Sequence, residues 1–136
     1  MEDTISKVYV TWEEVEILVN DLCEEIKKNI PWVENIKGLP RGGLIPAVMI
    51  SHKLGLPLLG NTEGRNENTL IVDDIADSGK TLEGYKGWST AVLHYKPHTS
   101  SVIPTVYAEE FLIDDWIVYP WERKDSKTIQ DYIYNK

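Results

Sequence analysis

Residues 70–82, LIVDDIADSGKTL, join an apolar run to side chains that can bind ions and phosphates. Asp73 and Asp74 are adjacent, and such carboxylates accept hydrogen bonds from vicinal hydroxyls or help to hold Mg²⁺. The SGKT that follows, residues 78–81, offers backbone N–H groups and two hydroxyls where a strand is expected to turn into a helix, a favourable place for an anion. Together these groups indicate a ribose 5-phosphate site.

Two other interpretations of this stretch are less favourable. A solvated acidic turn that caps a helix would explain a DD pair, but not the apolar strand before it together with SGKT behind it. A nucleotide-triphosphatase P-loop would explain SGKT, yet that motif has a glycine five positions before Gly79, where this chain has Asp74. A carboxylate there would repel the phosphate, so we exclude the P-loop.

A second loop of interest is PRGG, residues 40–43. Ligands of open parallel sheets bind in loops beyond the carboxyl ends of the strands. PRGG follows a predicted strand near residues 33–39 and precedes a predicted helix over residues 44–54, where Gly55 is the stop signal. The DDIADSGKT loop follows a predicted strand over residues 69–74 in the same way. We therefore expect both loops at one edge of a sheet.

The remaining periodicities alternate between helix and strand. Residues 11–29 are expected to form the first helix, whose start has the capping-box spacing of Thr11 and Glu14. The other predicted elements are strands at residues 56–60, 90–96 and 101–108, a helix start at 78–88, a short aromatic segment at 114–122 and a terminal helix at 126–135. Such alternation is typical of an α/β fold with a mostly parallel sheet flanked by helices.

The composition fits one folded domain over residues 1–136, with 42% hydrophobic and 26% charged residues. A formal net charge of −8 argues against nucleic-acid and anionic-membrane partners, which need a basic face. The sequence has no recognisable signal peptide and no apolar run long enough to cross a bilayer, so we expect a cytoplasmic protein. Cys23 is predicted to be a core residue of the first helix, and the three histidines have no metal-ligand spacing and are expected to be structural or surface residues.

The motif LIVDDIADSGKTL resembles the phosphoribosyl-pyrophosphate (PRPP) motif of type I phosphoribosyltransferases, and PRGGLIPAVMISHKLG resembles their pyrophosphate loop with its helix. The segments YVTWEEV, YKP and DDWIVYPWE are similar in kind and order to those of the xanthine-guanine and hypoxanthine phosphoribosyltransferases. The resemblance covers nearly the whole chain. It implies a Mg²⁺-dependent transferase of purine salvage, which moves the 5-phosphoribosyl group of PRPP onto guanine, xanthine or hypoxanthine and releases pyrophosphate.

On the PRPP side, the resemblance implies that Asp73 and Asp74 bind the ribose hydroxyls and Mg²⁺. The residues implied to cradle the 5-phosphate are Asp77, Ser78, Gly79, Lys80 and Thr81. Those implied to bind pyrophosphate are Arg41, Gly42 and Gly43, with a cis peptide bond just before Arg41. Arg41 and Mg²⁺ would then stabilise the leaving group.

On the base side, the resemblance assigns Lys96 to the exocyclic oxygen of the purine, Trp116 to stacking on its ring and the backbone carbonyl of Ile117 to its exocyclic amino edge. Taken alone, Lys96 would fit an ordinary surface lysine, and Trp116 would fit a core or interface residue. Asp77 is implied to act as the general base near N7 of the purine.

The chain departs from the family pattern between its predicted strands at residues 56–60 and 69–74. The family has a long flexible loop there, which closes over the reacting centre, whereas this chain has only LLGNTEGRNEN. Arg65, or a neighbouring subunit of a homodimer or homotetramer, could supply part of the missing charge. The short loop favours an alternative, a regulatory protein that binds PRPP or a nucleotide with little or no transferase activity. The complete set of base-side and PRPP-side residues favours the enzyme.

Overall fold

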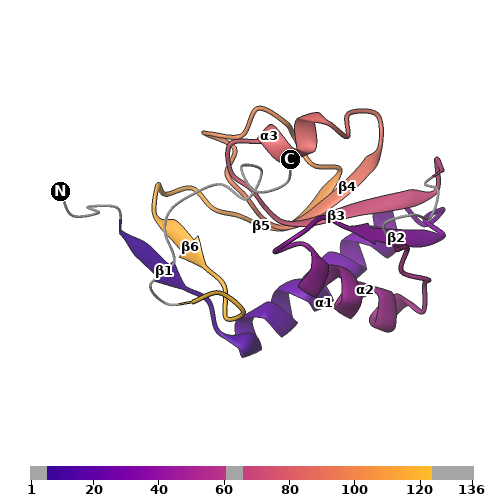
Figure 1. Ribbon diagram of the computed structural model, residues 1–136, viewed down its shortest axis with the longest axis horizontal. Helices are drawn as coiled ribbons and strands as arrows, with labels where there is room; N and C mark the ends of the chain where they lie inside the picture. The colour runs from indigo at the N-terminus through magenta and orange to yellow at the C-terminus, as the bar shows by residue number, and fades with distance from the viewer. Residues whose placement is uncertain (1–5, 61–65, 124–136) are drawn as a thin grey trace.

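A four-stranded sheet forms the centre of the computed structural model, which describes residues 6–60 and 66–123 (Figure 1). Its strands are β2 (Asn35–Gly38), β3 (Thr69–Ala76), β4 (Ser89–Tyr95) and β5 (Val106–Glu110), in that order across the sheet. All three neighbouring pairs are parallel. The prediction of an α/β fold with a parallel sheet is therefore confirmed.

Helices cover both faces of this sheet (Figure 1). Helices α1 (Trp12–Asn29) and α2 (Leu44–Leu54) pack on one face, and the short α3 (Lys80–Glu83) lies on the other. Helix α1 begins with the predicted capping box, since the N–H of Glu14 donates to Oγ1 of Thr11 at 3.1 Å and the N–H of Thr11 donates to Oε1 of Glu14 at 2.9 Å. The glycine that follows α2 has a φ of +67°, the left-handed conformation that ends helices.

The two faces of the sheet have separate apolar cores. The larger core lies under α1 and α2, where Cys23 is 5% exposed, which confirms that it is a core residue. The smaller core forms around Ile71 and Leu82 on the side of α3. Strand β3 serves both cores because its side chains alternate, with Leu70 and Val72 in the larger core and Ile71 in the smaller one. Burial on both faces explains the continuous apolar run in its sequence.

A second, two-stranded sheet stands apart from the main one (Figure 1). Strands β1 (Lys7–Tyr9) and β6 (Trp116–Val118) are parallel. The sequence pattern does not predict β1, because three residues are too few for a periodic signal. Lys96, directly after β4, donates to the backbone oxygen of Asp115, directly before β6. The β1–β6 pair therefore lies next to the carboxyl end of the main sheet.

Two predicted elements are longer than those observed. The strand predicted at residues 101–108 begins only at Val106, and the segment before it contains Pro104, which cannot donate to a ladder. A helix is predicted to start within residues 78–88, and the helix observed there, α3, has only four residues. Two glycines follow within four residues. The second, Gly87, has a φ of +91°, which is incompatible with a right-handed helix, so α3 cannot extend through it.

The segment between α2 and β3 also differs from its prediction. In place of a strand at residues 56–60, there is a single bridge between Leu58 and Ile36. Residues 61–65 of the short loop and the terminal helix predicted at residues 126–135 lie outside the described residues. Within the described part of the chain, every helix is too short or too polar to span a membrane.

Candidate active site

The PRGG loop packs directly against the aspartate pair of β3. A Cβ atom on Gly42 would overlap the carboxylate of Asp74, and a Cβ atom on Gly43 would lie 2.8 Å from Cα of Asp73. Glycine is required at both positions because the close approach leaves no space for a side chain. The two loops that were expected at one edge of the sheet therefore meet there.

The backbone of the PRGG loop is held by its own hydrogen bonds. The peptide bond between Pro40 and Arg41 is cis, as the resemblance implies. The N–H of Gly43 donates to the oxygen of Leu39 at 2.9 Å, and the N–H of Leu44 donates to the oxygen of Arg41 at 3.2 Å. The Arg41 residue is exposed, so its guanidinium can meet an anion that arrives from solvent.

The two adjacent aspartates are buried, with Asp73 8% and Asp74 7% exposed, which is rare for carboxylates. Oδ1 of Asp73 accepts a hydrogen bond from the N–H of Asp74 at 2.9 Å. Among the described residues, no group of three or more His, Cys, Asp or Glu could hold a metal ion. Mg²⁺ commonly takes one or two protein carboxylates and completes its shell with water and substrate oxygens. The pair fits a Mg²⁺ ion shared with a substrate rather than one held by protein alone.

Residues 75–82 curve around a small recess at the start of α3 and include all five residues predicted to cradle a phosphate. Gly79 has a φ of +84°, and a Cβ atom there would lie 2.7 Å from the backbone nitrogen of Ser101. The N–H of Ser101 donates to the oxygen of Ser78 at 2.9 Å, and Oγ of Ser78 accepts from the N–H of Lys80 at 3.2 Å. The segment after β4 therefore packs on SGKT and fixes its backbone.

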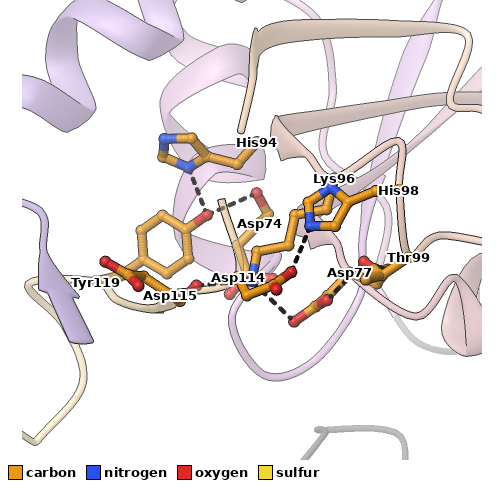
Figure 2. Close-up of polar contacts among 9 residues, drawn as sticks. All are labelled: Asp74, Asp77, His94, Lys96, His98, Thr99, Asp114, Asp115 and Tyr119. Carbon is orange, nitrogen blue, oxygen red and sulfur yellow. Dashed lines mark hydrogen bonds and ion pairs between the residues drawn. The ribbon is translucent and has the colours of Figure 1, made fainter. Parts of the chain in front are cut away.

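Lys96 is 3% exposed at the carboxyl end of β4 (Figure 2). Its Nζ atom donates to the backbone oxygen of Asp115 at 2.7 Å and lies 3.7 Å from Oδ2 of Asp77. The same atom is 5.6 Å from the centroid of the Phe111 ring. Burial of an ammonium group is costly unless it is paired, and these contacts provide the pairing. Lys96 is thus an internal link between the segment before β6 and the phosphate loop, not a surface lysine.

Thr99 is a site residue that sequence reasoning missed. Its Oγ1 atom lies 2.7 Å from the backbone oxygen of Asp77 and 3.1 Å from Oδ1 of the same residue (Figure 2). Lys96 lies near Oδ2 of Asp77, and the one hydroxyl proton of Thr99 is shared between the backbone oxygen and Oδ1 of Asp77, so Asp77 is held from two sides. An exposed threonine in a loop belongs to no motif. The one sequence feature that could have pointed to Thr99 is its position three residues after Lys96.

Strand β6 contains Trp116 and Ile117. The N–H of Trp116 donates to the oxygen of Ser6 at 2.8 Å, and the N–H of Val10 donates to the oxygen of Val118 at 2.9 Å. Backbone groups of successive residues in a parallel ladder point to opposite sides. The carbonyl of Ile117 is therefore directed away from β1, which suits the implied contact with the amino edge of a base.

Comparison with known proteins gives the family. No family model matches the sequence. A xanthine-guanine phosphoribosyltransferase of Nitratidesulfovibrio vulgaris (strain Hildenborough) is 30% identical, over 88% of this chain and 88% of that protein. The chain belongs to the type I phosphoribosyltransferase family.

Solved structures of type I phosphoribosyltransferases agree with this assignment. A purine phosphoribosyltransferase from Pyrococcus horikoshii is 33% identical with a TM-score of 0.73, and the match covers 89% of this chain and 97% of that one. A xanthine-guanine-hypoxanthine phosphoribosyltransferase from Helicobacter pylori has a TM-score of 0.74 at 18% identity, covering 86% of this chain and 93% of that one, so it shows the fold. The resemblance drawn from the sequence motifs is confirmed.

The candidate site of this family member also has a buried tyrosine–histidine pair that sequence reasoning missed. Nδ1 of His94 lies 2.8 Å from the hydroxyl oxygen of Tyr119. The pKa of His94 is lowered to about 4, chiefly by burial; Glu14 opposes this shift and Lys96 adds to it. Burial also raises the pKa of Tyr119, with Asp74 adding to the shift. Both groups are therefore neutral near pH 7 and act through hydrogen bonds.

The described structure gathers the predicted site residues of this family member at one edge of the sheet. The PRGG loop, the aspartate pair, the phosphate recess and Lys96 lie together, and the segment with Trp116 and Ile117 is joined to them through Asp115. The roles of these residues toward PRPP and a purine stay predictions.

Proposed function

We propose that the chain is a purine phosphoribosyltransferase that transfers the 5-phosphoribosyl group of PRPP to guanine, xanthine or hypoxanthine in purine salvage. A ring nitrogen of the purine forms a bond to C1 of the ribose as the bond from C1 to pyrophosphate breaks. The observation that carries the proposal is the buried ammonium of Lys96, which lies between Oδ2 of Asp77 and the backbone oxygen of Asp115. It provides a hydrogen-bond donor for a base beside a phosphate loop.

The donor chemistry of Lys96 favours a 6-oxopurine. An ammonium group has three N–H donors and no acceptor, and one of its donors is directed to Asp115. O6 of guanine, xanthine or hypoxanthine can accept from another, whereas the amino group of adenine at that position also donates. A polar contact of this kind can reject the mismatched base strongly. The names of the similar proteins from N. vulgaris and P. horikoshii support a purine acceptor.

The PRPP-side residues have complementary tasks in this proposal. Asp73 and Asp74 accept hydrogen bonds from the ribose hydroxyls and help to hold Mg²⁺, which supplies positive charge to the pyrophosphate. The backbone N–H groups around Gly79 bind the 5-phosphate. The PRGG backbone and Arg41 stabilise the charge that develops on the leaving pyrophosphate.

On the base side, Asp77 accepts the proton that the purine loses, because Lys96 and Thr99 hold its carboxylate at a fixed place. Trp116 stacks on the purine ring, and the carbonyl of Ile117 accepts from the amino edge of guanine. The transition state has oxocarbenium character, so catalysis rests mainly on positioning and on charge stabilisation at pyrophosphate.

The test is an incubation of the purified protein with PRPP, MgCl₂ and each of guanine, xanthine, hypoxanthine and adenine, followed by chromatography of the nucleotide products. We expect nucleoside monophosphate from at least one 6-oxopurine and much less from adenine. Calorimetry with PRPP and MgCl₂ accompanies each assay. Binding of PRPP without nucleotide formation would contradict the transferase and support the regulatory alternative. A dilution series shows whether activity needs a homo-oligomer.

A further inference from the structure

Tyr119 connects the segment after β6 to the aspartate pair of β3. Its side chain is buried, and its hydroxyl donates to the backbone oxygen of Asp74 at 3.2 Å. The same hydroxyl oxygen lies 2.8 Å from Nδ1 of His94, a residue of β4 (Figure 2). Three segments that are distant in sequence therefore meet at one hydroxyl group.

The protons of this contact can be assigned by counting donors. A phenol hydroxyl has one proton, and a backbone oxygen can only accept. Since the Tyr119 proton is directed to Asp74, the hydrogen bond with His94 must use a proton on Nδ1 of the imidazole. The neutral histidine can supply it in the tautomer that carries hydrogen on Nδ1. His94 therefore fixes the orientation of the Tyr119 hydroxyl.

The Asp74 carbonyl lies beyond the end of the neighbouring strand. Strand β2 pairs with β3 only as far as Gly38 opposite Val72, and the N–H of Leu39 donates to the oxygen of Val72 at 2.9 Å. The chain then turns into the PRGG loop, whose Gly42 packs on the Asp74 carboxylate. Tyr119 thus supplies a hydrogen bond to β3 after the ladder with β2 has ended.

The Tyr119 ring is held independently of its hydroxyl. It stacks on the ring of Trp121, with centroids 4.8 Å apart and an angle of 3° between the planes. Its backbone N–H donates to Oε1 of Glu122 at 2.8 Å, and the N–H of Glu122 donates to its oxygen at 2.9 Å. Removal of the hydroxyl alone should therefore leave the ring in place.

We propose that Tyr119 is a positioning residue whose hydroxyl fixes the Asp74 backbone relative to β6, with His94 orienting the hydroxyl. This inference rests on the proposed function, in which Asp74 binds PRPP and β6 binds the base. The hydroxyl then couples the two halves of the site, so its loss weakens PRPP use more than base use.

The variant Tyr119→Phe tests the proposal in steady-state assays with MgCl₂. We expect kcat/KM for PRPP to fall by about tenfold, with KM for guanine changed by less than about twofold. Tyr107→Phe is the matched control, because it removes a tyrosine hydroxyl that donates to Glu110 at 2.9 Å on β5, outside the candidate site. It should leave the kinetics unchanged. Equal kinetics for wild type and Tyr119→Phe would overturn the proposal.

His94 gives a second, independent comparison. In His94→Asn the side-chain amide can place an N–H close to where Nδ1 stands, whereas His94→Leu has no donor. We expect His94→Asn to retain more of kcat/KM for PRPP than His94→Leu at similar melting temperatures. Equal losses in the two variants would contradict an orienting hydrogen bond, and this pair carries the test if Tyr119→Phe does not fold.

A readout without turnover separates this proposal from the proposed function. Hydrogen exchange of the peptide over residues 70–79, followed by mass spectrometry, should be faster in Tyr119→Phe than in wild type and Tyr107→Phe. Faster exchange in a protein that forms no nucleotide would leave the connection to Asp74 standing while the transferase proposal fails. If the wild type forms nucleotide but Tyr119→Phe shows unchanged exchange, the connection between Tyr119 and Asp74 is contradicted and the transferase proposal is not.

Discussion

The ammonium of Lys96 lies 3.7 Å from the carboxylate of Asp77, and both groups are largely shielded from water. This pair joins the end of β4, which faces the expected base, to the loop that faces the expected 5-phosphate. Thr99 completes the arrangement from the other carboxylate oxygen. A change at any of these three residues should therefore affect both substrates, and the kinetics of each can be measured separately.

Lys96→Met should relax the choice of base. Methionine retains the apolar length of the side chain but provides no donor for O6, so we expect kcat/KM for guanine and hypoxanthine to fall by at least about tenfold. The rate with adenine should fall less, because adenine loses only the contribution of Lys96 to the placement of Asp77 and no contact of its own with the ammonium. Lys37→Met is the control, since it removes a lysine of β2 that donates to the backbone oxygen of Gly60. An unchanged ratio of guanine to adenine turnover would contradict the base assignment of Lys96.

The double variant Asp73→Asn with Asp74→Asn should weaken PRPP binding. It removes two negative acceptors for the ribose hydroxyls and for Mg²⁺, so we expect calorimetry with MgCl₂ to show an affinity at least about tenfold lower. Glu16→Gln with Asp21→Asn removes the same charge from exposed positions of α1 and should bind PRPP as wild type does. Equal affinities in all three proteins would show that the pair does not bind PRPP.

Thr99→Val should slow the chemical step with little loss of stability. Valine keeps the shape of threonine but lacks the hydroxyl that contacts Asp77. We therefore expect kcat to fall by about tenfold while the fold is retained. Thr105→Val gives the opposite pattern, because its Oγ1 accepts from the N–H of Thr90 away from the site. It should lower the melting temperature and leave kcat unchanged. A lowered melting temperature with normal kcat in Thr99→Val would argue against a role in positioning Asp77.

The elements that the sequence predicted well have strong local signals. The capping box of α1 and the apolar run of β3 depend on neighbours in the chain, and both are present in the structure. The aspartate pair, the PRGG loop and SGKT are contiguous motifs, so their meeting follows once a parallel sheet is inferred. The family resemblance added Lys96, which no local pattern distinguishes from a surface lysine.

The residues that were missed act through tertiary contacts alone. Thr99 meets Asp77 across 22 positions of sequence, and Tyr119 meets Asp74 across 45. Strand β1 is too short for a periodic pattern and is fixed by its pairing with β6. No residue type or spacing in one sequence encodes such contacts, because they arise only when the whole sheet is assembled.

His94 should make the stability of the protein depend on pH. Burial holds its pKa near 4 in the folded state, whereas an exposed histidine titrates near 6.5. The nearby groups that affect its charge are Glu14, which raises the pKa, and Lys96, which lowers it, and the hydroxyl of Tyr119 faces its Nδ1. Below the unfolded pKa, the unfolded chain therefore binds a proton that folded His94 does not. The free energy of unfolding should fall as pH falls through this window.

The variant His94→Asn separates the contribution of His94 to this pH dependence from the contributions of other titrating groups. The contribution of His94 is at most about 3 kcal/mol, and it should be lost progressively between about pH 6.5 and pH 4. Urea unfolding of wild type and His94→Asn at several pH values gives the difference in unfolding free energy, which should shrink by that amount toward the acidic end. His52→Asn, at an exposed position of α2, is the matched histidine substitution outside the Tyr119 contact. Parallel curves for wild type and His94→Asn would mean that His94 is protonated as readily in the folded protein as in the unfolded chain, contrary to its burial.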